Sequence, residues 1–193
     1  MLRTHPTICI GGAKEFGFSL IELMIGISIL AILMSVALPS FRTWTQDTKV
    51  RNAAEAIKNG MMQARAEAIS RNANVEFGLI GTTSEWQACL SPCSTNASFA
   101  TRKANDGSKG VTLVSSSTTL GAATKVTFNF LGLVAPNVDG SGQLAVVDVT
   151  APGNSRNMRV TVGTQAAPPL GVYSGNMPKM CDPNPSAPIS TRC

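Results

Sequence analysis

The longest apolar pattern in the chain runs from Phe18 to Leu38, where Glu22 is the only charged side chain. As a helix, these roughly 21 residues span about 31 Å, which matches the hydrocarbon thickness of a bilayer. The run is too long for the apolar core of an ordinary secretory signal, and Pro39-Ser40 is a poor match to a signal cleavage site. The pattern therefore predicts a membrane-spanning helix.

Beyond Pro39 the apolar positions recur at spacings of three and four, which is the pattern of a helix with one buried face. The helix is therefore expected to continue through residues 39–73 and to pack on a sheet. On its solvent face, Glu55 is expected to pair with Lys58 and Glu67 with Arg71. The buried stripe consists of Val50, Ala54, Ile57, Met61, Ala64 and Ala68.

From Asn74 onward, short alternating runs rich in Thr, Ser, Gly and Val replace the helical pattern and predict an α+β fold. The Asp-Gly-Ser-Gly segment at residues 139–142 lacks the further acidic ligands of a calcium loop, so it predicts an ordinary hairpin turn. Candidate strands cover Val75 to Ile80, Glu85 to Leu90, Val111 to Ser115, Lys125 to Leu131, Gln143 to Val149 and Met158 to Val162.

The composition excludes most catalytic classes. The single histidine, His5, lies near the N-terminus, so Ser-His-Asp triads, Cys-His pairs and His-ligated metal sites have only this residue to draw on. The acidic residues are scattered and form no paired-carboxylate cluster for acid–base chemistry. Sixteen Lys and Arg against 11 Asp and Glu give a net charge of +5, which predicts a solvated basic surface. We expect no active site, cofactor or metal.

The segment GFSLIELM, followed by the long apolar run and Pro39, resembles the prepilin signature of type IV pilins and type II secretion pseudopilins. The resemblance implies that a prepilin peptidase cuts between Gly17 and Phe18 and methylates the new Phe18 amine. It also implies that Glu22 pairs with the N-terminal amine of a neighbouring subunit during assembly, and that the helix bends or unwinds locally at Pro39.

The role implied for Glu22 agrees with physical expectation. An ionisable group inside a membrane span is costly, and a carboxylate and an ammonium that are buried together lower each other's desolvation cost. The simpler alternative is that this carboxylate, which lies close to the start of the apolar run, reaches up to the lipid headgroups. Both interpretations stay open on the sequence.

The later helix and the tail resemble the FimT/GspH family of minor pilins and minor pseudopilins. The helix carries the typical Ala-Arg-x-Glu-Ala segment at residues 64–68, and the tail reads Met-Cys-Asp-Pro at residues 180–183. The resemblance implies a pilin-like α+β fold, with a long N-terminal helix packed on an antiparallel β-sheet domain. Some members bind DNA through a Gly-Arg-x-Arg motif, but this chain reads Gly-Asn-Met-Pro-Lys at residues 175–179. DNA binding through Arg156, Arg159 and Lys179 is therefore possible but not expected.

The cleavage that the resemblance implies would remove Cys9 and leave four cysteines in a domain expected in the periplasm, which favours disulfides. Three pairings are possible, and we favour the local ones, Cys89 with Cys93 and Cys181 with Cys193. A loop of about a dozen residues closed in this way contributes roughly 3 kcal/mol in the chain-entropy model. Zinc ligation by the Cys-x-x-x-Cys segment is the less favoured alternative, because the mature chain has no histidine.

Together these patterns predict a leader at residues 1–17, a transmembrane and filament-core helix at 18–38, its amphipathic continuation at 39–73 and a periplasmic β-rich domain at 74–193. The expected function is that of a minor pilin in type IV pilus biogenesis; the alternatives are a type II secretion minor pseudopilin and a pilus-associated DNA receptor. The expected partners are the prepilin peptidase, other pilins or pseudopilins and the inner membrane assembly platform. The chain is expected to cross the inner membrane once before it enters a filament, and Arg3 and Lys14 favour a cytoplasmic N-terminus.

Overall fold

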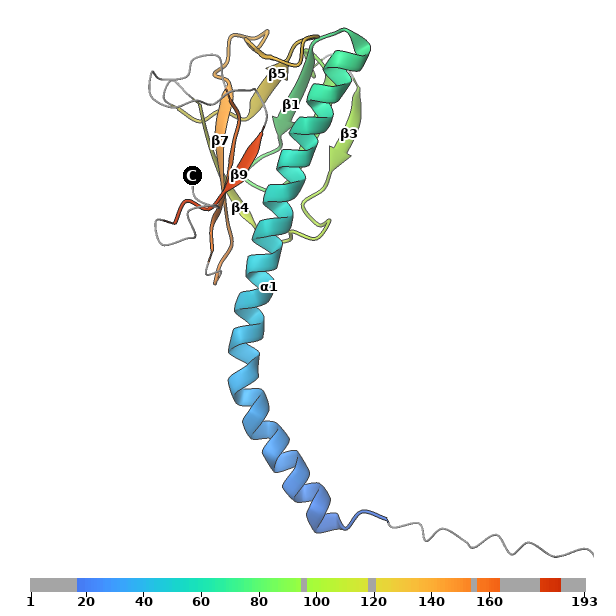
Figure 1. Cartoon of the computed structure of the whole chain (residues 1–193), viewed down its shortest axis with the longest axis vertical. Helices are drawn as coiled ribbons and strands as arrows, with labels where there is room; N and C mark the ends of the chain where they lie inside the picture. The colour runs from blue at the N-terminus through green and yellow to red at the C-terminus, as the bar shows by residue number, and fades with distance from the viewer. Residues whose placement is uncertain (1–16, 95–96, 118–120, 154–155, 164–177, 185–193) are drawn as a thin grey trace, which may run out of the picture. The chain divides into compact units, whose positions relative to one another are not determined.

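The computed structural model describes residues 17–94, 97–117, 121–153, 156–163 and 178–184 (Figure 1). The chain divides into two compact units, Met1–Ser40 and Phe41–Cys193. One long helix, α1 (Leu20–Arg71), begins in the first unit and ends in the second, where antiparallel strands follow it. The helix is assigned on both sides of Pro39, and the bend expected there stays a prediction.

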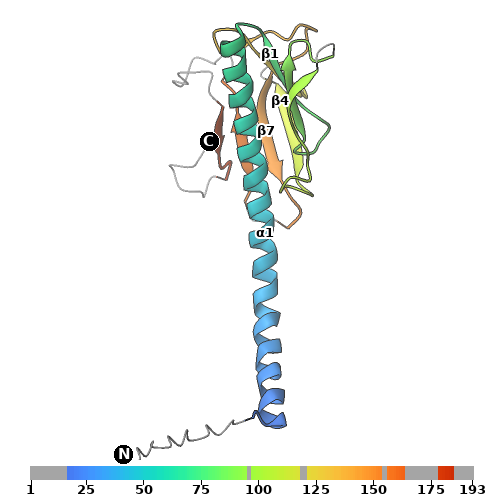
Figure 2. The same ribbon diagram turned by 90° about the vertical axis from the view of Figure 1, so that its right-hand side faces the viewer.

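The second half of α1 buries the face that its apolar spacing predicts. All six positions of the predicted stripe are completely buried, together with Ala53, and Gly60 lies on the same face. Small residues at these positions let the helix approach the strands closely, as Figure 2 shows for the part of α1 that runs alongside them. On the solvent face Glu67 pairs with Arg71 as expected, with 2.6 Å between Oε2 and Nε, whereas Glu55 pairs with Arg51 rather than with Lys58.

The strands form two antiparallel sheets. The five-stranded sheet has the order β3-β2-β1-β5-β6, and the four-stranded sheet has the order β4-β7-β8-β9. The first contains β1 (Val75–Leu79), β2 (Trp86–Leu90), β3 (Ser98–Arg102), β5 (Lys125–Phe128) and β6 (Val134–Ala135). The second contains β4 (Thr112–Ser117), β7 (Leu144–Thr150), β8 (Met158–Thr161) and β9 (Lys179–Cys181).

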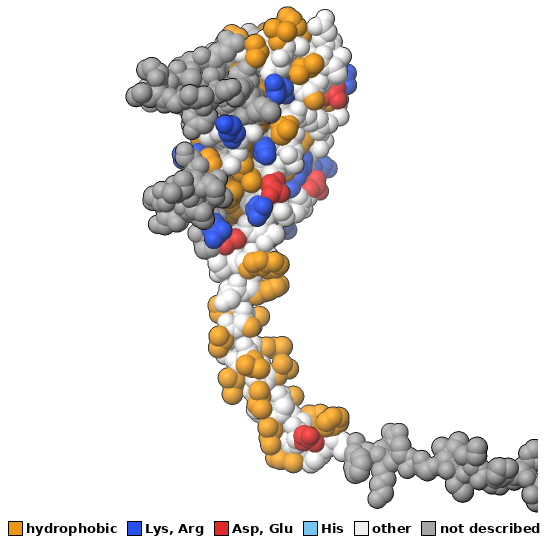
Figure 3. Space-filling model, viewed as in Figure 1, with side chains coloured by type: hydrophobic (Ala, Val, Ile, Leu, Met, Phe, Trp, Pro, Cys, Tyr) orange, Lys and Arg blue, Asp and Glu red, His pale blue; other side chains and the backbone are white. Residues whose placement is uncertain are grey.

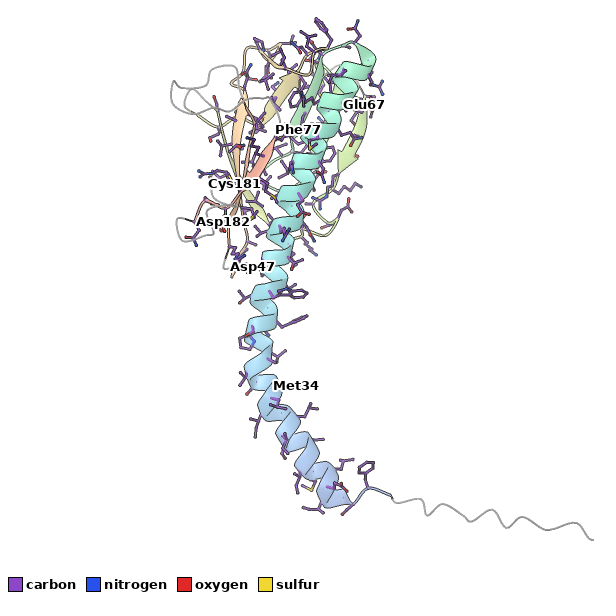
Figure 4. All side chains as sticks on the ribbon, viewed as in Figure 1. Met34, Asp47, Glu67, Phe77, Cys181 and Asp182 are labelled. Carbon is purple, nitrogen blue, oxygen red and sulfur yellow. A yellow bond between two sulfur atoms is a disulfide. The ribbon has the colours of Figure 1, made fainter. Side chains whose placement is uncertain are left out.

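A single hydrophobic core joins the helix to both sheets. It contains Ile57 and Met61 from α1, Phe77 and Phe128 from the first sheet, and Val147 from the second. Gly60 lies at the closest approach, because a Cβ there would be 2.7 Å from the Trp86 indole and 2.9 Å from the Phe77 ring. Phe77 is labelled between α1 and the strands in Figure 4. The core thus fixes the second half of α1 on the strands.

Two expectations about the strands need correction. Three short strands, β3, β6 and β9, were not predicted; they have two to five residues and few large apolar side chains. The Asp-Gly-Ser-Gly segment at residues 139–142 is not a hairpin turn, because it connects β6 to β7 and these strands belong to different sheets. Within it, Asp139 accepts hydrogen bonds from the Ser141 backbone N–H and hydroxyl, and Gly140 takes a φ of 73°.

Candidate assembly site

The apolar first part of α1 has no cover from the residues that the structure describes. Every residue from Gly17 to Arg42 is exposed, and Phe18 is 84% exposed. Within the described ranges, α1 is the one helix that is long and apolar enough to cross a membrane, by length and composition. Figure 3 shows hydrophobic side chains along the whole of this part. So large an apolar surface indicates burial in lipid or against other protein chains.

The hydroxyl groups within this apolar segment are satisfied by the helix itself. Ser28 Oγ donates a hydrogen bond to the Met24 carbonyl at 2.8 Å, and Ser35 Oγ donates one to the Ile32 carbonyl at 2.7 Å. A hydroxyl paired in this way needs no water, so it can enter an apolar medium at little cost. These two serines are therefore compatible with burial.

Glu22 is different. It lies in the first turn of α1, where the unpaired backbone N–H groups of the helix start favour a negative charge. No hydrogen bond or ion pair links its carboxylate to any residue within the described ranges. It is the fourth residue after Phe18, whose backbone nitrogen becomes the N-terminus if the leader is removed. The segment thus combines an apolar surface with one carboxylate that needs a cation from elsewhere.

The Ala-Arg-x-Glu-Ala segment holds the end of α1 on the strands. Ala64 and Ala68 are completely buried, and Arg65 Nε donates a 2.8 Å hydrogen bond to the Gly132 carbonyl in the β5–β6 turn. Glu67 pairs with Arg71, whose guanidinium lies 4.7 Å from the centre of the Phe99 ring on β3. The motif therefore has a structural role, which the sequence resemblance did not reveal.

A disulfide joins Cys89 at the end of β2 to Cys93 in the following turn, with 5.4 Å between the two Cα atoms. This is one of the two local pairings expected from the sequence. Cys181, labelled in Figure 4, is disulfide-bonded as well. The expected partner, Cys193, lies outside the described residues, so that pairing stays a prediction. Next to Cys181, Asp182 is buried and accepts a hydrogen bond from the Asn184 backbone N–H.

The three cationic residues considered for DNA contact lie on or beside β8 and β9, and the guanidinium of one of them, Arg159, contacts a carboxylate of the same chain. Arg159 makes two hydrogen bonds to Asp148, its cross-strand partner on β7, at 2.6 and 2.9 Å. This hydrogen bonding raises the pKa of Arg159 above its ordinary value. The Arg156 backbone N–H donates to Asp47 on α1 at 3.2 Å. Lys179 is exposed on β9, on the same face as Arg159.

A cluster of three charged side chains, Lys125, Asp139 and Glu76, was not predicted from the sequence. Lys125 on β5 pairs with Asp139 in the loop before β7, and its Nζ lies 3.9 Å from Oε1 of the largely buried Glu76. The hydrogen bond from Lys125, aided by Ser141, holds the pKa of Asp139 far below its usual range, and the same bond raises the pKa of Lys125. These residues are distant in sequence, so spacing gives no signal for them. Among the described residues, no three metal-ligating side chains form a group.

Comparison with known proteins agrees with this description. The chain matches the family models of the prokaryotic N-terminal methylation motif at residues 12–38 and of the type II transport protein GspH at residues 53–166. No curated protein matches it.

Two solved structures are similar to this chain. The type IV minor pilin FimU of Pseudomonas aeruginosa is 16% identical, with a TM-score of 0.48 and coverage of 64% of this chain and 87% of FimU. The minor pseudopilin EpsH of the Vibrio cholerae type 2 secretion system is 10% identical, with a TM-score of 0.48 and coverage of 70% of this chain and 98% of EpsH. The GspH model spans more than half of the sequence, and the chain belongs to the GspH family of pilin-like proteins.

Proposed function

We propose that this protein is a minor pilin that helps to start or complete a type IV pilus. The observation that carries the proposal is the exposed apolar segment from Phe18 to Leu38 with Glu22 near its start. A folded domain joined to such a segment is suited to storage in the inner membrane and to later packing against other helices. The domain is then on the periplasmic side, and the N-terminus starts on the cytoplasmic side.

Assembly begins in this proposal when a prepilin peptidase cleaves after Gly17 and methylates the amine of Phe18. In lipid, apolar helices gain little from contact with each other, because the acyl chains are as apolar as their side chains. A polar contact must then select the correct neighbour. Glu22 supplies that contact by pairing with the N-terminal amine of another subunit, which also removes the cost of a lone charge in the filament core.

The choice of a pilus over a secretion filament rests on the disulfides and on the Cys-Asp-Pro tail. The disulfide at Cys181 and the turn that Asp182 forms beside it support a stapled C-terminal segment of the kind the resemblance suggests. The alternative, a type II secretion minor pseudopilin, uses the same anchor and the same assembly step. A DNA receptor is less favoured, because Arg159 already binds Asp148.

An in-frame deletion in the native host tests the proposal. Sheared surface pili and enzymes secreted into the medium are measured in the same strains, with the wild-type gene returned as a control. Loss of pili with normal secretion is the expected result. Normal pili with failed secretion would assign the chain to the pseudopilins. Normal pili and normal secretion together would overturn both roles and direct attention to DNA uptake.

A further inference from the structure

Two aromatic side chains on α1 are exposed just beyond the apolar segment. Phe41 is 61% exposed and Trp44 is 63% exposed, whereas the other tryptophan, Trp86, is only 6% exposed. The Phe41 and Trp44 rings contact each other, with 5.9 Å between their centres and 38° between their planes. Since they are three residues apart on a helix, they form one aromatic patch on one face.

Packing of the domain does not explain this patch. The first completely buried residue of α1 is Val50, about two turns further along the chain. The apolar segment ends at Leu38, so the patch lies between the proposed membrane span and the part of α1 that packs on the strands. Arg42 within the patch is exposed as well.

The composition of the patch fits one environment. Trp is one of the side chains that concentrate at a membrane–water interface. A long Arg side chain near the end of a span can extend its charge to the same region, and the Phe41 ring adds apolar surface beside Trp44. There an indole ring contacts acyl chains while its N–H bonds to headgroups, and a guanidinium binds phosphates. The neighbouring hydroxyls are satisfied locally, because Thr45 donates to the Phe41 carbonyl and Thr48 to the Trp44 carbonyl.

We infer that Phe41, Arg42 and Trp44 bind the phospholipid headgroup region on the side of the membrane where the folded domain lies, and that they fix the depth of the span. The inference rests on the proposed membrane anchoring.

Depth-dependent fluorescence quenching in phosphatidylcholine vesicles tests this inference with the full chain. Trp86→Phe leaves Trp44 as the only tryptophan. Lipids brominated near the headgroup end of the acyl chain should quench its emission at least about twofold more than lipids brominated near the chain end. A matched reporter carries Trp44→Phe, Trp86→Phe and Leu30→Trp, and its emission should be quenched most by bromine near the chain end.

The two reporters separate the possible failures. In the first failure, bromine near the chain end quenches the Leu30→Trp reporter, but Trp44 is quenched only by aqueous iodide or only by bromine near the chain end. This result overturns the interfacial anchor and leaves membrane anchoring intact. Absence of lipid quenching in both reporters overturns anchoring and, with it, the proposed function. A series of lipid-to-protein ratios tests whether a second copy of the chain covers the patch instead of lipid. If Trp44 shows no lipid quenching at any ratio in the series, while the Leu30→Trp reporter is quenched, a second copy covers the patch and the inference fails.

Discussion

At the residue scale, the described surroundings of Gly17 leave room for a side chain. A Cβ at Gly17 would meet nothing within 4 Å in the described structure, and the same is true of Gly26 within the apolar segment. Neither glycine is therefore needed for packing within the subunit. If the proposed cleavage requires a small residue at position 17, that requirement comes from the peptidase and not from packing of the subunit.

Replacing Gly17 tests the processing step. We expect Gly17→Val to leave the leader attached, because a β-branched side chain blocks the backbone before the scissile bond. Intact-mass measurement of the protein from the native host checks this. Gly26→Ala is the matched control and should be processed normally, whereas a trimmed and methylated Phe18 in the Gly17→Val protein would contradict the assignment.

Glu22 has no function within the subunit that the described residues reveal, so its loss should not disturb folding. We expect Glu22→Ala to insert in the membrane at wild-type levels and to appear in sheared filaments at a tenth or less of the wild-type amount. Immunoblots of membrane and filament fractions measure both quantities. Glu55→Ala, which removes an exposed acid paired with Arg51 on the same helix, should assemble normally. Equal incorporation of Glu22→Ala would refute the docking role.

Asp139 gives the domain a pH dependence. Its pKa is lowered in the folded chain, chiefly by the hydrogen bond from Lys125, so its contribution to stability is complete above the unfolded pKa of about 3.9 and falls as the pH drops below that value. We expect Asp139→Asn to be less stable than wild type at pH 7 and the difference to shrink below about pH 4. Urea unfolding of the full chain in detergent at several pH values measures it. A constant difference across this range would exclude the ion pair as its cause.

At the scale of elements, the contact between α1 and the strands depends on the absence of a side chain at Gly60. We expect Gly60→Ala to lower the free energy of unfolding, because overpacking against two aromatic rings costs about 1–3 kcal/mol. This exceeds the gain of roughly 1 kcal/mol from the higher helix propensity of alanine. Gly78→Ala is the control, since its Cβ would come no closer than 4.0 Å to Lys125. Urea midpoints that rank the two variants in the opposite order would contradict this packing.

The elements with a long repeating pattern were predictable from the sequence, and the short ones were not. The stripe from Val50 to Ala68 spans several helical turns, and its burial on the strands is confirmed. The six predicted strands are all present, and no end is shifted by more than three residues. In contrast, β9 has three residues in a proline-rich tail, and β6 has two. Such strands form because a neighbouring edge is available, and only the folded sheet provides that edge.

The candidate site divides in the same way. Gly17, Phe18 and Glu22 follow from a local motif, and the matching family model supports that motif. The roles of Arg65 and Arg159 depend on Gly132 and Asp148, which are distant in sequence or on another strand, so no spacing rule reveals them. The sequence predicted only a solvated basic surface for such cations, yet Arg65 and Arg159 each link two elements of the domain.

For the molecule as a whole, these internal contacts limit what the basic surface can bind. We expect the full chain in detergent to bind duplex DNA no tighter than the roughly 10⁻⁴ to 10⁻⁶ M of non-specific contacts, and to lose that binding as salt rises. Fluorescence anisotropy with a labelled duplex measures this. Asp148→Ala should tighten binding, because it releases Arg159. Nanomolar binding by the wild-type chain at 0.15 M salt would instead establish a DNA receptor.

If the domain crosses the membrane as proposed, the interleaved order of the two sheets constrains when it can fold. Among the described strands, β4 pairs with β7 alone, and β5 and β6 lie between them in the chain but pair within the other sheet. While the polypeptide emerges from a translocation channel, β4 therefore has no partner strand until β7, which ends at Thr150, has followed it. During this interval β4 is an unpaired strand, and a chaperone that shields such strands would act on it.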